Sequence, residues 1–311
     1  MKAIRIHSYG DRSVLRCEDA PTPEIAADDL LVRIVATSIN PVDWKVRQGY
    51  LAAMIPYAMP LILGWDFSGI VEKVGTATSR FKVGDEVFAR PDITRNGTYA
   101  EYIAVRESEV ALKPRFVSHV QAACLPLAGI TAWEALFTTA DVQAGQTVLI
   151  HAGAGGVGSL AIQLAHWKGA RVIATTSSAN RELVASLGAD EVIDYTAAPF
   201  QDSVKNVDMV FDTVGGAVQD ASWGVLKRGG ILVSCTDKPS SEKADALGVR
   251  QAFIFIGPNA EILRQMAGLV ETGKLRSVIG AEFALADLAL AHDLSQTGRA
   301  RGKIAIHVGK P

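Results

Sequence analysis

The sequence predicts an α/β protein with two lobes, the second of which is built on a doubly wound parallel sheet. At 311 residues the chain exceeds the length at which a single hydrophobic core keeps growing. Residues 1–120 contain short strand-like runs separated by proline and glycine, and beyond them strand-like runs alternate with helical ones. Such alternation is typical of parallel strands joined by right-handed helical crossovers.

The first lobe is expected to be rich in β-structure and to include the C-terminal residues 258–311. The final elements do not extend the alternating pattern, so we expect them to return to the first lobe. A cleft between two lobes is then the default ligand site. In this part of the chain we expect strands over 1–6, 30–39, 69–74, 86–89, near Val278 and over 303–308, with helices over 262–272 and 285–294.

Residues 121–257 are expected to form the parallel-sheet domain. A helix over 179–187 is closed by Gly188, and Gly257-Pro258 ends the last strand. The predicted strands are 147–150, 172–176, 191–193, 209–211, 231–234 and 253–256.

Composition and charge exclude several classes of protein. The hydrophobic content of 49%, the charged content of 21% and the net charge of −2 describe an ordinary globular protein, with no basic block for nucleic acid or anionic membranes. No apolar stretch reaches the length of a membrane span, and the N-terminus lacks the apolar core of a signal peptide, so the cytoplasm is expected. Cys17, Cys124 and Cys235 are too few and too far apart for a disulfide framework or a four-cysteine zinc site.

A glycine cluster follows the predicted strand 147–150. Gly153, Gly155 and Gly158 have the spacing of a dinucleotide-binding turn, and an amphipathic helical pattern follows them. Glycines permit a tight turn and a close approach of the backbone to a pyrophosphate, whose charge the helix N-terminus stabilises. The order strand, turn and helix therefore predicts a dinucleotide cofactor.

The next strand indicates which dinucleotide binds. An NAD site usually has Asp or Glu about 20 residues beyond the glycine turn, to bind the ribose diol. Here the strand ends in Ser177 and Ser178, Arg181 follows, and the first carboxylate is Glu182 inside the next helix. A guanidinium and hydroxyls suit a 2′-phosphate, so we predict NADPH; a serine helix cap followed by a surface arginine is the alternative interpretation.

Six motifs in order resemble one family over essentially the full length of the chain. They are 40–49 (NPVDWKVRQG), 64–69 (GWDFSG), 84–87 (GDEV), 97–102 (GTYAEY), 125–132 (LPLAGITA) and the glycine turn 153–158. The chain resembles the medium-chain dehydrogenase/reductases, in their zinc-free quinone oxidoreductase (zeta-crystallin-like) and alkenal reductase branch. The resemblance implies a GroES-like β-rich catalytic domain and a Rossmann domain that binds NADPH.

The resemblance also implies that metal ligands are absent. Zinc-dependent relatives place a cysteine where this chain has Asn40, and a His-Glu pair where it has Trp65-Asp66. Tryptophan cannot bind a metal and asparagine is a poor zinc ligand, so we expect no metal site.

By the same resemblance, Asn40, Lys45 and Thr131 are expected at the nicotinamide, with Asn40 or Lys45 stabilising a developing enolate. Alternatively, Asn40 is only a turn residue, Thr131 a helix cap and Lys45 a solvated side chain. Asp43 and Asp66 form a possible acid–base pair, although cap and turn roles explain them equally well. The other residues implied are Gly155, Gly156 and Val157 for the pyrophosphate, Ser177, Arg181 and Tyr195 for the 2′-phosphate, Val214 and Gly215 for the adenosine or ribose, Phe253 and Phe255 for the carboxamide, and Lys303 at the cleft rim.

Without a metal, hydride transfer is easiest to conjugated acceptors, so we predict NADPH-dependent reduction of a quinone or an α,β-unsaturated carbonyl. Water or a loop phenol, Tyr50 or Tyr57, would supply the proton. The loop 48–60 would wall a pocket for a small apolar electrophile, or else plug the core. The alternatives are an enoyl-thioester reductase and a non-catalytic NADPH-binding protein, and the edge at 253–256 suggests a homodimer by strand pairing.

Overall fold

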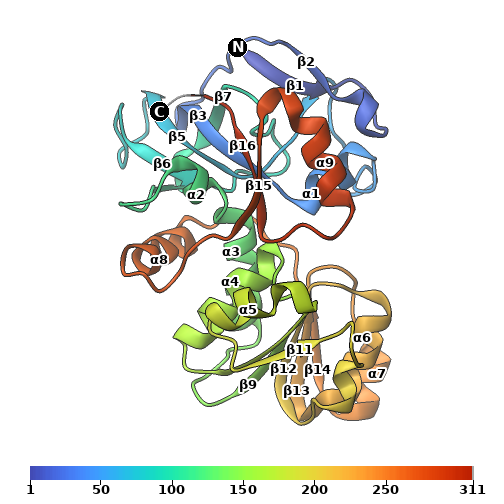
Figure 1. Cartoon of the computed structure of the whole chain (residues 1–311). Coiled ribbons are helices and arrows are strands. Elements are labelled where there is room, and N and C mark those ends of the chain that lie inside the picture. The colour runs from blue at the N-terminus through green and yellow to red at the C-terminus, as the bar shows by residue number, and fades with distance from the viewer. Residues whose placement is uncertain (310–311) are drawn as a thin grey trace. The chain divides into compact units, whose positions relative to one another are not determined.

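A computed structural model describes residues 1–309, which fall into two compact units (Figure 1). Unit 1 contains Met1–Leu127 together with the chain from Gly257 onward, and unit 2 contains Ala128–Ile256. The C-terminal part of the chain thus shares a unit with the N-terminal part. In Figure 1 the red strands β15 and β16 lie beside the blue strand β3.

Unit 1 is built on two sheets. In the larger sheet the order is β15 (Ile279–Ala284), β16 (Lys303–His307), β3 (Asp29–Ile39), β5 (Phe67–Val74), β6 (Glu86–Ala89) and β8 (Val110–Leu112), with β7 (Tyr102–Arg106) also paired to β3. The smaller sheet has the order β2 (Arg16–Asp19), β1 (Lys2–Ile6) and β4 (Leu61–Ile62). Strand β3 is buried along most of its eleven residues, which explains its nearly continuous apolar sequence.

Helices α1 and α9 of unit 1 pack on a core that contains the fully buried Trp65 and Tyr99. Val46 of α1 and Leu288 of α9 belong to this core, and the two helices contact each other. The helices are α1 (Pro41–Arg47), α2 (His119–Ala123), α8 (Ala260–Glu271) and α9 (Leu288–Gln296), and α3 (Pro126–Trp133) leads into unit 2.

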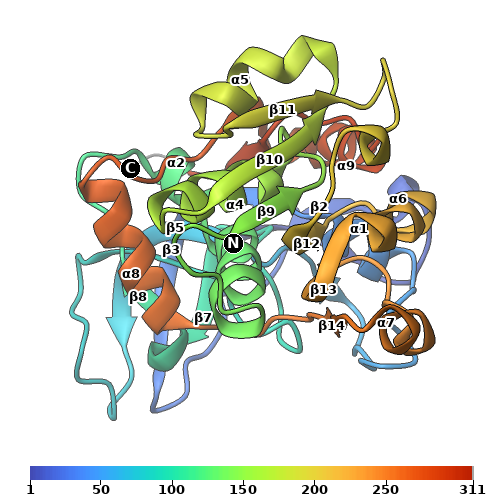
Figure 2. The same ribbon diagram turned by 90° about the horizontal axis from the view of Figure 1, so that it is seen from below.

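Unit 2 contains one parallel sheet of six strands. Their order is β11 (Glu191–Asp194), β10 (Arg171–Thr176), β9 (Thr147–Ile150), β12 (Val207–Asp212), β13 (Leu226–Ser234) and β14 (Arg250–Phe253), as Figure 2 shows. Numbered along the chain, this is the order 3-2-1-4-5-6 of a doubly wound dinucleotide-binding sheet. The winding reverses between β9 and β12, and ligands of such sheets bind at the carboxyl ends of the strands near this point.

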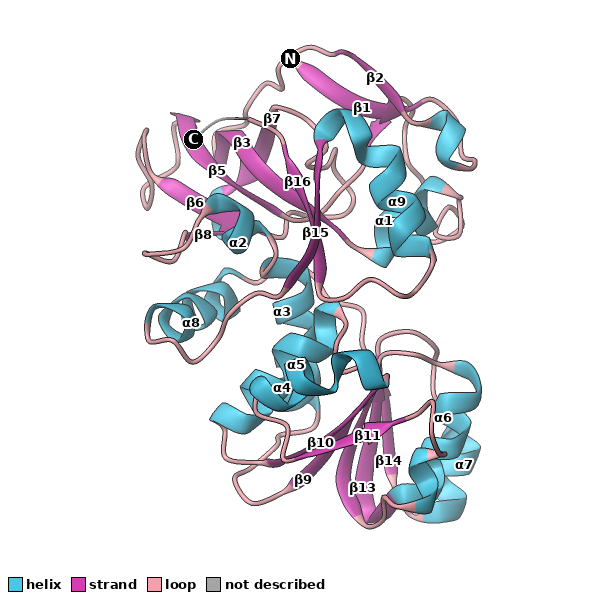
Figure 3. Cartoon of the chain, viewed as in Figure 1, coloured by secondary structure: helices cyan, strands magenta, loops and turns pink. Residues whose placement is uncertain are grey.

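Helices cover both faces of this sheet (Figure 3). Helices α4 (Gly156–Trp167) and α5 (Arg181–Ser186) lie on one face, and α6 (Gly216–Ser222) and α7 (Ser241–Leu247) lie on the other. The predicted α/β class, with a parallel sheet in the second half, is therefore confirmed. A π-helical turn follows α3, and short 3-10 helices occupy Arg12–Val14, Glu107–Glu109, Ser178–Asn180, Phe200–Asp202, Trp223–Val225 and Leu285–Asp287.

The prediction of a last strand over 253–256 is wrong. Strand β14 covers Arg250–Phe253, and Phe253 pairs with Ser234, the last residue of its neighbour β13. Strand β13 ends at Ser234, so the residues after Phe253 have no neighbouring strand to pair with. The last hydrogen bond to β13 runs from the amide of Ile254 to the Ser234 carbonyl at 2.9 Å, and the apolar run then leaves the sheet. The length of the partner strand, rather than the apolar run, ends β14.

Within residues 1–309 no helix combines the length and the apolar character needed to cross a membrane.

Candidate dinucleotide site and buried polar cluster

The glycine turn of unit 2 is so tight that it has little room for side chains. After β9, Ala152 adopts a left-handed conformation with φ of 48°, and the Gly155 amide bonds back to the Ala152 carbonyl at 2.9 Å. A Cβ atom on Gly158 would lie 2.3 Å from that carbonyl oxygen, so no other residue fits there without a shift of the backbone. A Cβ atom on Gly153 would lie 3.1 Å from the Cβ of Ala174 in β10. The spacing seen in the sequence thus has a steric cause.

The turn leads into the N-terminus of α4, a helix of twelve residues. Gly155 is its N-cap residue and supplies no side chain to bond the first amides. The amides of Gly156, Val157 and Gly158 have no carbonyl one turn earlier within the helix, so they face outward. The helix dipole adds a partial positive charge at this end. This is an anion-binding arrangement, and it begins directly after the carboxyl end of β9.

The residues predicted to bind a 2′-phosphate lie at the carboxyl edge of the sheet, where the glycine turn also lies. Thr176 of β10 pairs with Asp194 of β11, and the Tyr195 amide bonds to the Thr176 carbonyl at 3.2 Å. Ser177 and Tyr195 therefore follow neighbouring strands directly, and Arg181 begins α5. Arg181 is exposed and forms no ion pair with any residue in 1–309, so its guanidinium is available to a ligand.

A buried carboxylate shapes the loop after β12. Asp212 is fully buried, and its Oδ1 accepts hydrogen bonds from the amides of Val214 at 3.0 Å and Gly215 at 2.8 Å. Gly215 has a φ of 83°, and a Cβ atom there would lie 2.2 Å from Oδ2 of Asp237. The carboxylate thus holds Val214 and Gly215 at the carboxyl edge. Asp212 was not among the residues predicted from the sequence, although an acidic residue that closes an apolar strand is a signal for such a role.

The remaining candidates in unit 2 differ in exposure. Phe253 and Phe255 are half exposed, at 43% and 51%. Thr131 is buried inside α3 and caps neither end of that helix. The cap interpretation of Thr131 is therefore excluded, and its part in cofactor binding stays a prediction.

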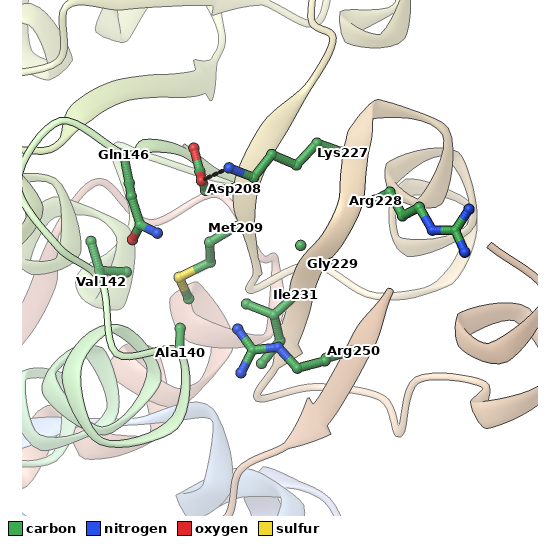
Figure 4. Close-up of a pocket in the computed structure, with 11 residues that line it drawn as sticks. Ala140, Val142, Gln146, Asp208, Met209, Lys227, Arg228, Gly229, Ile231 and Arg250 are labelled. Atoms are coloured by element: carbon green, nitrogen blue, oxygen red, sulfur yellow. Dashed lines mark ion pairs between the residues drawn. The ribbon is translucent and has the colours of Figure 1, made fainter. Parts of the chain in front are cut away.

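The hollow drawn in Figure 4 lies at the opposite edge of the sheet from the glycine turn. It has a volume of about 210 Å³, and Asp208, Lys227 and Arg250 line it from the amino ends of β12, β13 and β14. Lys227 and Asp208 pair across its mouth. Because dinucleotides bind at the carboxyl edge of such sheets, this hollow is not the predicted cofactor site.

Unit 1 contains a buried polar cluster centred on Asn40, Asp66 and Lys303, which are at most 4% exposed. Asn40 Nδ2 donates to Asp66 Oδ2 at 2.8 Å, and Lys303 Nζ donates to the same oxygen at 3.1 Å. Lys303 Nζ also donates to Asn40 Oδ1 and to the Ile39 carbonyl. Asp66 is further bonded by Ser38 Oγ at 2.7 Å. The ammonium, amide and carboxylate bond one another in a part of the structure that is almost closed to water.

The position of Lys303 differs from the sequence expectation. It was expected at a cleft rim, but it lies inside unit 1 because β16 runs antiparallel to the end of β3, with Ile304 opposite Ile39. This pairing joins residues far apart in the chain, which is why the sequence alone could not place it.

Asp43 is a second buried carboxylate in this region. Its Oδ2 accepts from the Asn40 amide at 2.7 Å and from the Tyr99 hydroxyl, whereas its Oδ1 has no donor among residues 1–309. Burial raises the pKa of Asp43 to about 7, although these two hydrogen bonds act in the opposite direction. Asn40 is thus the N-cap residue of α1, and the Asp43 carboxylate accepts from its backbone amide. Because the Asn40 side chain also bonds Asp66, Asn40 is more than a turn residue, and its part at the nicotinamide stays a prediction.

A buried arginine–histidine contact supports α1 from behind. Arg47 Nη1 lies 3.0 Å from Nδ1 of His292 in α9, and Arg47 Nη2 donates to Gln296 at 2.9 Å. Burial, together with the Arg47 charge, lowers the pKa of His292 to about 3, so the imidazole is neutral and accepts from the arginine. The contact between Arg47 and His292 could not be predicted from the sequence, since 245 residues separate them in the chain.

The three remaining catalytic candidates occupy α1 and the loop after it. Lys45 Nζ lies 5.8 Å from the ring centre of Trp44, and the half-exposed lysine forms no ion pair with a residue in the described range. Tyr50 is 69% exposed and packs edge to face against Trp44. Tyr57 is half-buried beside Trp65, and its hydroxyl is buried without a partner among residues 1–309. Burial raises the pKa of Tyr57.

The loop 48–60 packs partly against the core, and its role as the wall of a substrate pocket stays a prediction. Leu51, Ile55, Tyr57 and Met59 pack against the core of unit 1, whereas Met54 is 61% exposed. One side of the loop therefore plugs the core, and the other side is exposed.

Comparison with known proteins gives two family matches and several close relatives. Residues 26–115 match the alcohol dehydrogenase GroES-like domain, and residues 187–306 match the family described as zinc-binding dehydrogenase. The chain is 40% identical to a 2-methylene-furan-3-one reductase of Solanum lycopersicum and 39% identical to an NADPH-dependent alkenal/one oxidoreductase of Arabidopsis thaliana, named as chloroplastic. Each alignment covers 99% of this chain and 79% of the relative.

A solved structure shows the same fold over the whole length. The quinone oxidoreductase from Coxiella burnetii superposes with a TM-score of 0.93 at 38% identity, covering 99% of both chains. These matches extend through both units and agree with the six motifs of the sequence. The chain belongs to the medium-chain dehydrogenase/reductase family, among its quinone oxidoreductases and alkenal reductases.

Proposed function

We propose that the protein is an NADPH-dependent oxidoreductase that transfers hydride, without zinc, to a quinone or an α,β-unsaturated carbonyl. The observation that carries the proposal is the buried cluster of Asn40, Asp66 and Lys303, which has an ammonium where a zinc-dependent dehydrogenase needs metal ligands. The names of the relatives, which include an NADPH-dependent alkenal/one oxidoreductase and a quinone oxidoreductase, support the same reaction class.

The residues of unit 2 fit NADPH. The amides of Gly155, Gly156 and Val157 would bind the pyrophosphate, where the absence of Cβ atoms on the two glycines lets a ligand approach the backbone. Arg181 has no competing ion pair and would bind the 2′-phosphate, with Ser177 and Tyr195 beside it. The other proposed contacts are Val214 and Gly215 at the adenosine or ribose, Phe253 and Phe255 at the carboxamide, and Thr131, Asn40 and Lys45 at the nicotinamide.

The residues of unit 1 do not fit a zinc ion. Oδ1 of Asn40 and Oδ2 of Asp66 both accept hydrogen bonds from the Lys303 ammonium, and Oδ1 of Asp66 accepts one from the Leu127 amide at 2.7 Å. Trp65, at the place of the ligand histidine, offers no lone pair and is fully buried. No step of the proposed mechanism therefore uses a metal.

When NADPH is bound it supplies the hydride, and the protein supplies position and charge. As hydride adds to the β-carbon of an enal or to a quinone, negative charge moves to the acceptor oxygen. Asn40 Nδ2 carries two N–H groups and donates one of them to Asp66, so one remains to stabilise that oxygen. Lys45, which has no carboxylate partner in residues 1–309, is the alternative donor.

The proton that completes the reaction would come from water or from a tyrosine of the loop 48–60. Tyr50 is exposed and can exchange its proton with solvent. The Tyr57 hydroxyl is buried and its pKa is raised, so it would act only as a proton donor and would have to be resupplied. Measuring kcat for Tyr50→Phe and for Tyr57→Phe distinguishes the two tyrosines, because proton transfer slows only when the residue that donates the proton is replaced.

We also propose that the protein forms a homodimer through the edge strand β14 (Arg250–Phe253), the last strand in its sheet. An unpaired edge offers backbone groups to the same strand of a second copy. Light scattering that showed only a monomer would remove this proposal.

The test of function is oxidation of NADPH by the purified protein in EDTA, with 1,4-benzoquinone and a 2-alkenal as acceptors and NADH as the control. Turnover that survives the chelator supports a zinc-free reductase, and the faster acceptor assigns the substrate class. Tight NADPH binding with no turnover of either acceptor would contradict the proposal and favour a non-catalytic NADPH-binding protein.

A further inference from the structure

Arg90 is the most unusual charged residue of unit 1. It is only 2% exposed, yet it forms no ion pair with any residue in 1–309. Its one hydrogen bond to the described chain runs from Nη1 to the carbonyl of the adjacent Pro91 at 3.1 Å, and its buried Nε has no partner. Burying a guanidinium in this state is costly, since charged groups removed from water need a partner.

The strand register places Arg90 beside the polar cluster. Ala89 is the last residue of β6 and pairs with Phe67, the first residue of β5, in antiparallel order. Arg90 directly follows Ala89 and Asp66 directly precedes Phe67, and the charge of Asp66 acts on the Arg90 guanidinium. Asp66 is the carboxylate that bonds Asn40 and Lys303.

The carboxylates around Arg90 are already satisfied by other donors. Asp66 accepts from the side chains of Asn40 and Lys303. Asp92 and Glu109 share the guanidinium of Arg106, each at 3.0 Å. Arg90 is therefore not needed as the counterion of any of them, although their charges help to keep its guanidinium protonated within the fold.

The free atoms of Arg90 have the geometry of a receptor for a carboxylate. Because Nη1 is used by the Pro91 carbonyl, the edge of the guanidinium that has no hydrogen-bond partner among residues 1–309 is the one formed by Nε and Nη2. Their two N–H bonds run parallel, and that pair matches the two oxygens of a carboxylate. Tyr57, whose hydroxyl is also buried without a partner, lies within range of the Arg90 charge.

We propose that Arg90 determines substrate specificity by binding a carboxylate carried by the acceptor, so that the preferred substrates are unsaturated ketones or aldehydes with an acid group at one end. This inference rests on the proposed reductase function. The apolar loop 48–60 would contact the hydrocarbon part of such a molecule, and Arg90 would hold its anionic end.

The test compares 4-oxo-2-pentenoate with its methyl ester as acceptors for the NADPH-loaded enzyme. Wild type is expected to favour the acid by at least about tenfold in kcat/KM, as for a charge-assisted bidentate contact. In Arg90→Met this ratio should fall by at least about tenfold, mainly through KM, and Arg90→Lys should recover part of it. The matched control is Arg95→Met, because Arg95 is paired with Asp29 at 2.7 Å; it should lose stability but keep the ratio.

Calorimetry with the unreactive analogue 4-oxopentanoate and its ester gives a second readout that needs no turnover. If wild type binds the acid more tightly than the ester, and Arg90→Met loses part of this preference, the inference is supported even when turnover of the substrate is slow. Equal use and equal binding of acid and ester by wild type would overturn it, whether or not the Arg90 variants fold. Turnover of benzoquinone or a 2-alkenal in the same preparation would then show that the reductase function itself stands.

Discussion

Replacing Asp43 by asparagine is expected to remove a large pH dependence from the stability of unit 1. In the folded protein burial raises the pKa of Asp43 to about 7, from an ordinary value of 3.8. Between these two values the unfolded chain releases the proton and the folded chain retains it. Stability therefore falls as pH rises through this range, and the loss is complete above the folded pKa.

The magnitude follows from the size of the pKa shift. The difference of roughly 3 units corresponds to about 4 kcal/mol, at 1.36 kcal/mol for each unit. About 2.5 kcal/mol of this falls between pH 5 and pH 8 when both titrations are included. Asparagine does not ionise, and its oxygen can accept the bonds from the Asn40 amide and the Tyr99 hydroxyl. Any fixed cost of the substitution is independent of pH.

The assay is urea unfolding of wild type and Asp43→Asn at several pH values, followed by the fluorescence of tryptophans such as the buried Trp65. The stability of the variant relative to wild type should increase steadily from pH 5 to pH 8. Asp19→Asn is the control, because Asp19 is exposed and its pKa is lowered, so its difference should stay flat over this range. A flat or decreasing difference for Asp43→Asn would refute the reasoning.

Three further substitutions test the sites. Arg181→Ala should raise KM for NADPH by about tenfold to a hundredfold and leave KM for NADH nearly unchanged, because the contact that is lost is the one to the 2′-phosphate, which NADH lacks. The control is Arg171→Ala, at the other end of β10, which should change neither KM. Equal increases in KM for both cofactors would contradict the assignment. Gly158→Ala should abolish NADPH binding in a fluorescence titration, since its Cβ would lie 2.3 Å from a carbonyl oxygen, whereas Gly224→Ala, with open space around it, should bind normally. Lys303→Met should lower the free energy of unfolding by about 3–5 kcal/mol in urea titrations, because it leaves the buried carboxylate of Asp66 without its ion-pair partner. A decrease of less than about 1 kcal/mol would show that Lys303 does not balance the charge of Asp66.

Local patterns were sufficient to predict most of unit 2. The apolar run of β9, the glycine turn and the amphipathic α4 are contiguous, and each is specified by neighbours in the chain. Steric contacts of Gly153 and Gly158 occur within this same stretch or with the next strand, so their spacing alone was informative. The last strand was mispredicted because its end depends on β13, which the apolar pattern of 253–256 does not encode.

The polar cluster of unit 1 could be predicted only in part. Asn40 was singled out through its motif, and Asp43 and Asp66 were weighed as an acid–base pair. Nothing in the sequence placed Lys303 against Asn40, because 263 residues separate them and the pairing of β16 with β3 brings them together. The lone guanidinium of Arg90 was equally invisible, since a surface arginine and a buried one look the same in a sequence.

The sequence by itself determined the fold class, the parallel sheet of unit 2 and the position of the dinucleotide turn, because periodicity and glycine sterics act over a few neighbouring residues. Only the tertiary structure decided which polar groups are buried and which of them are paired. Asp43 lies in α1, Lys303 lies in β16, and Asp66 and Arg90 lie just outside the ends of β5 and β6. Their charges interact strongly because packing has removed water from around them. Charge state and hydrogen-bond partners thus depend on long-range contacts that no local pattern records.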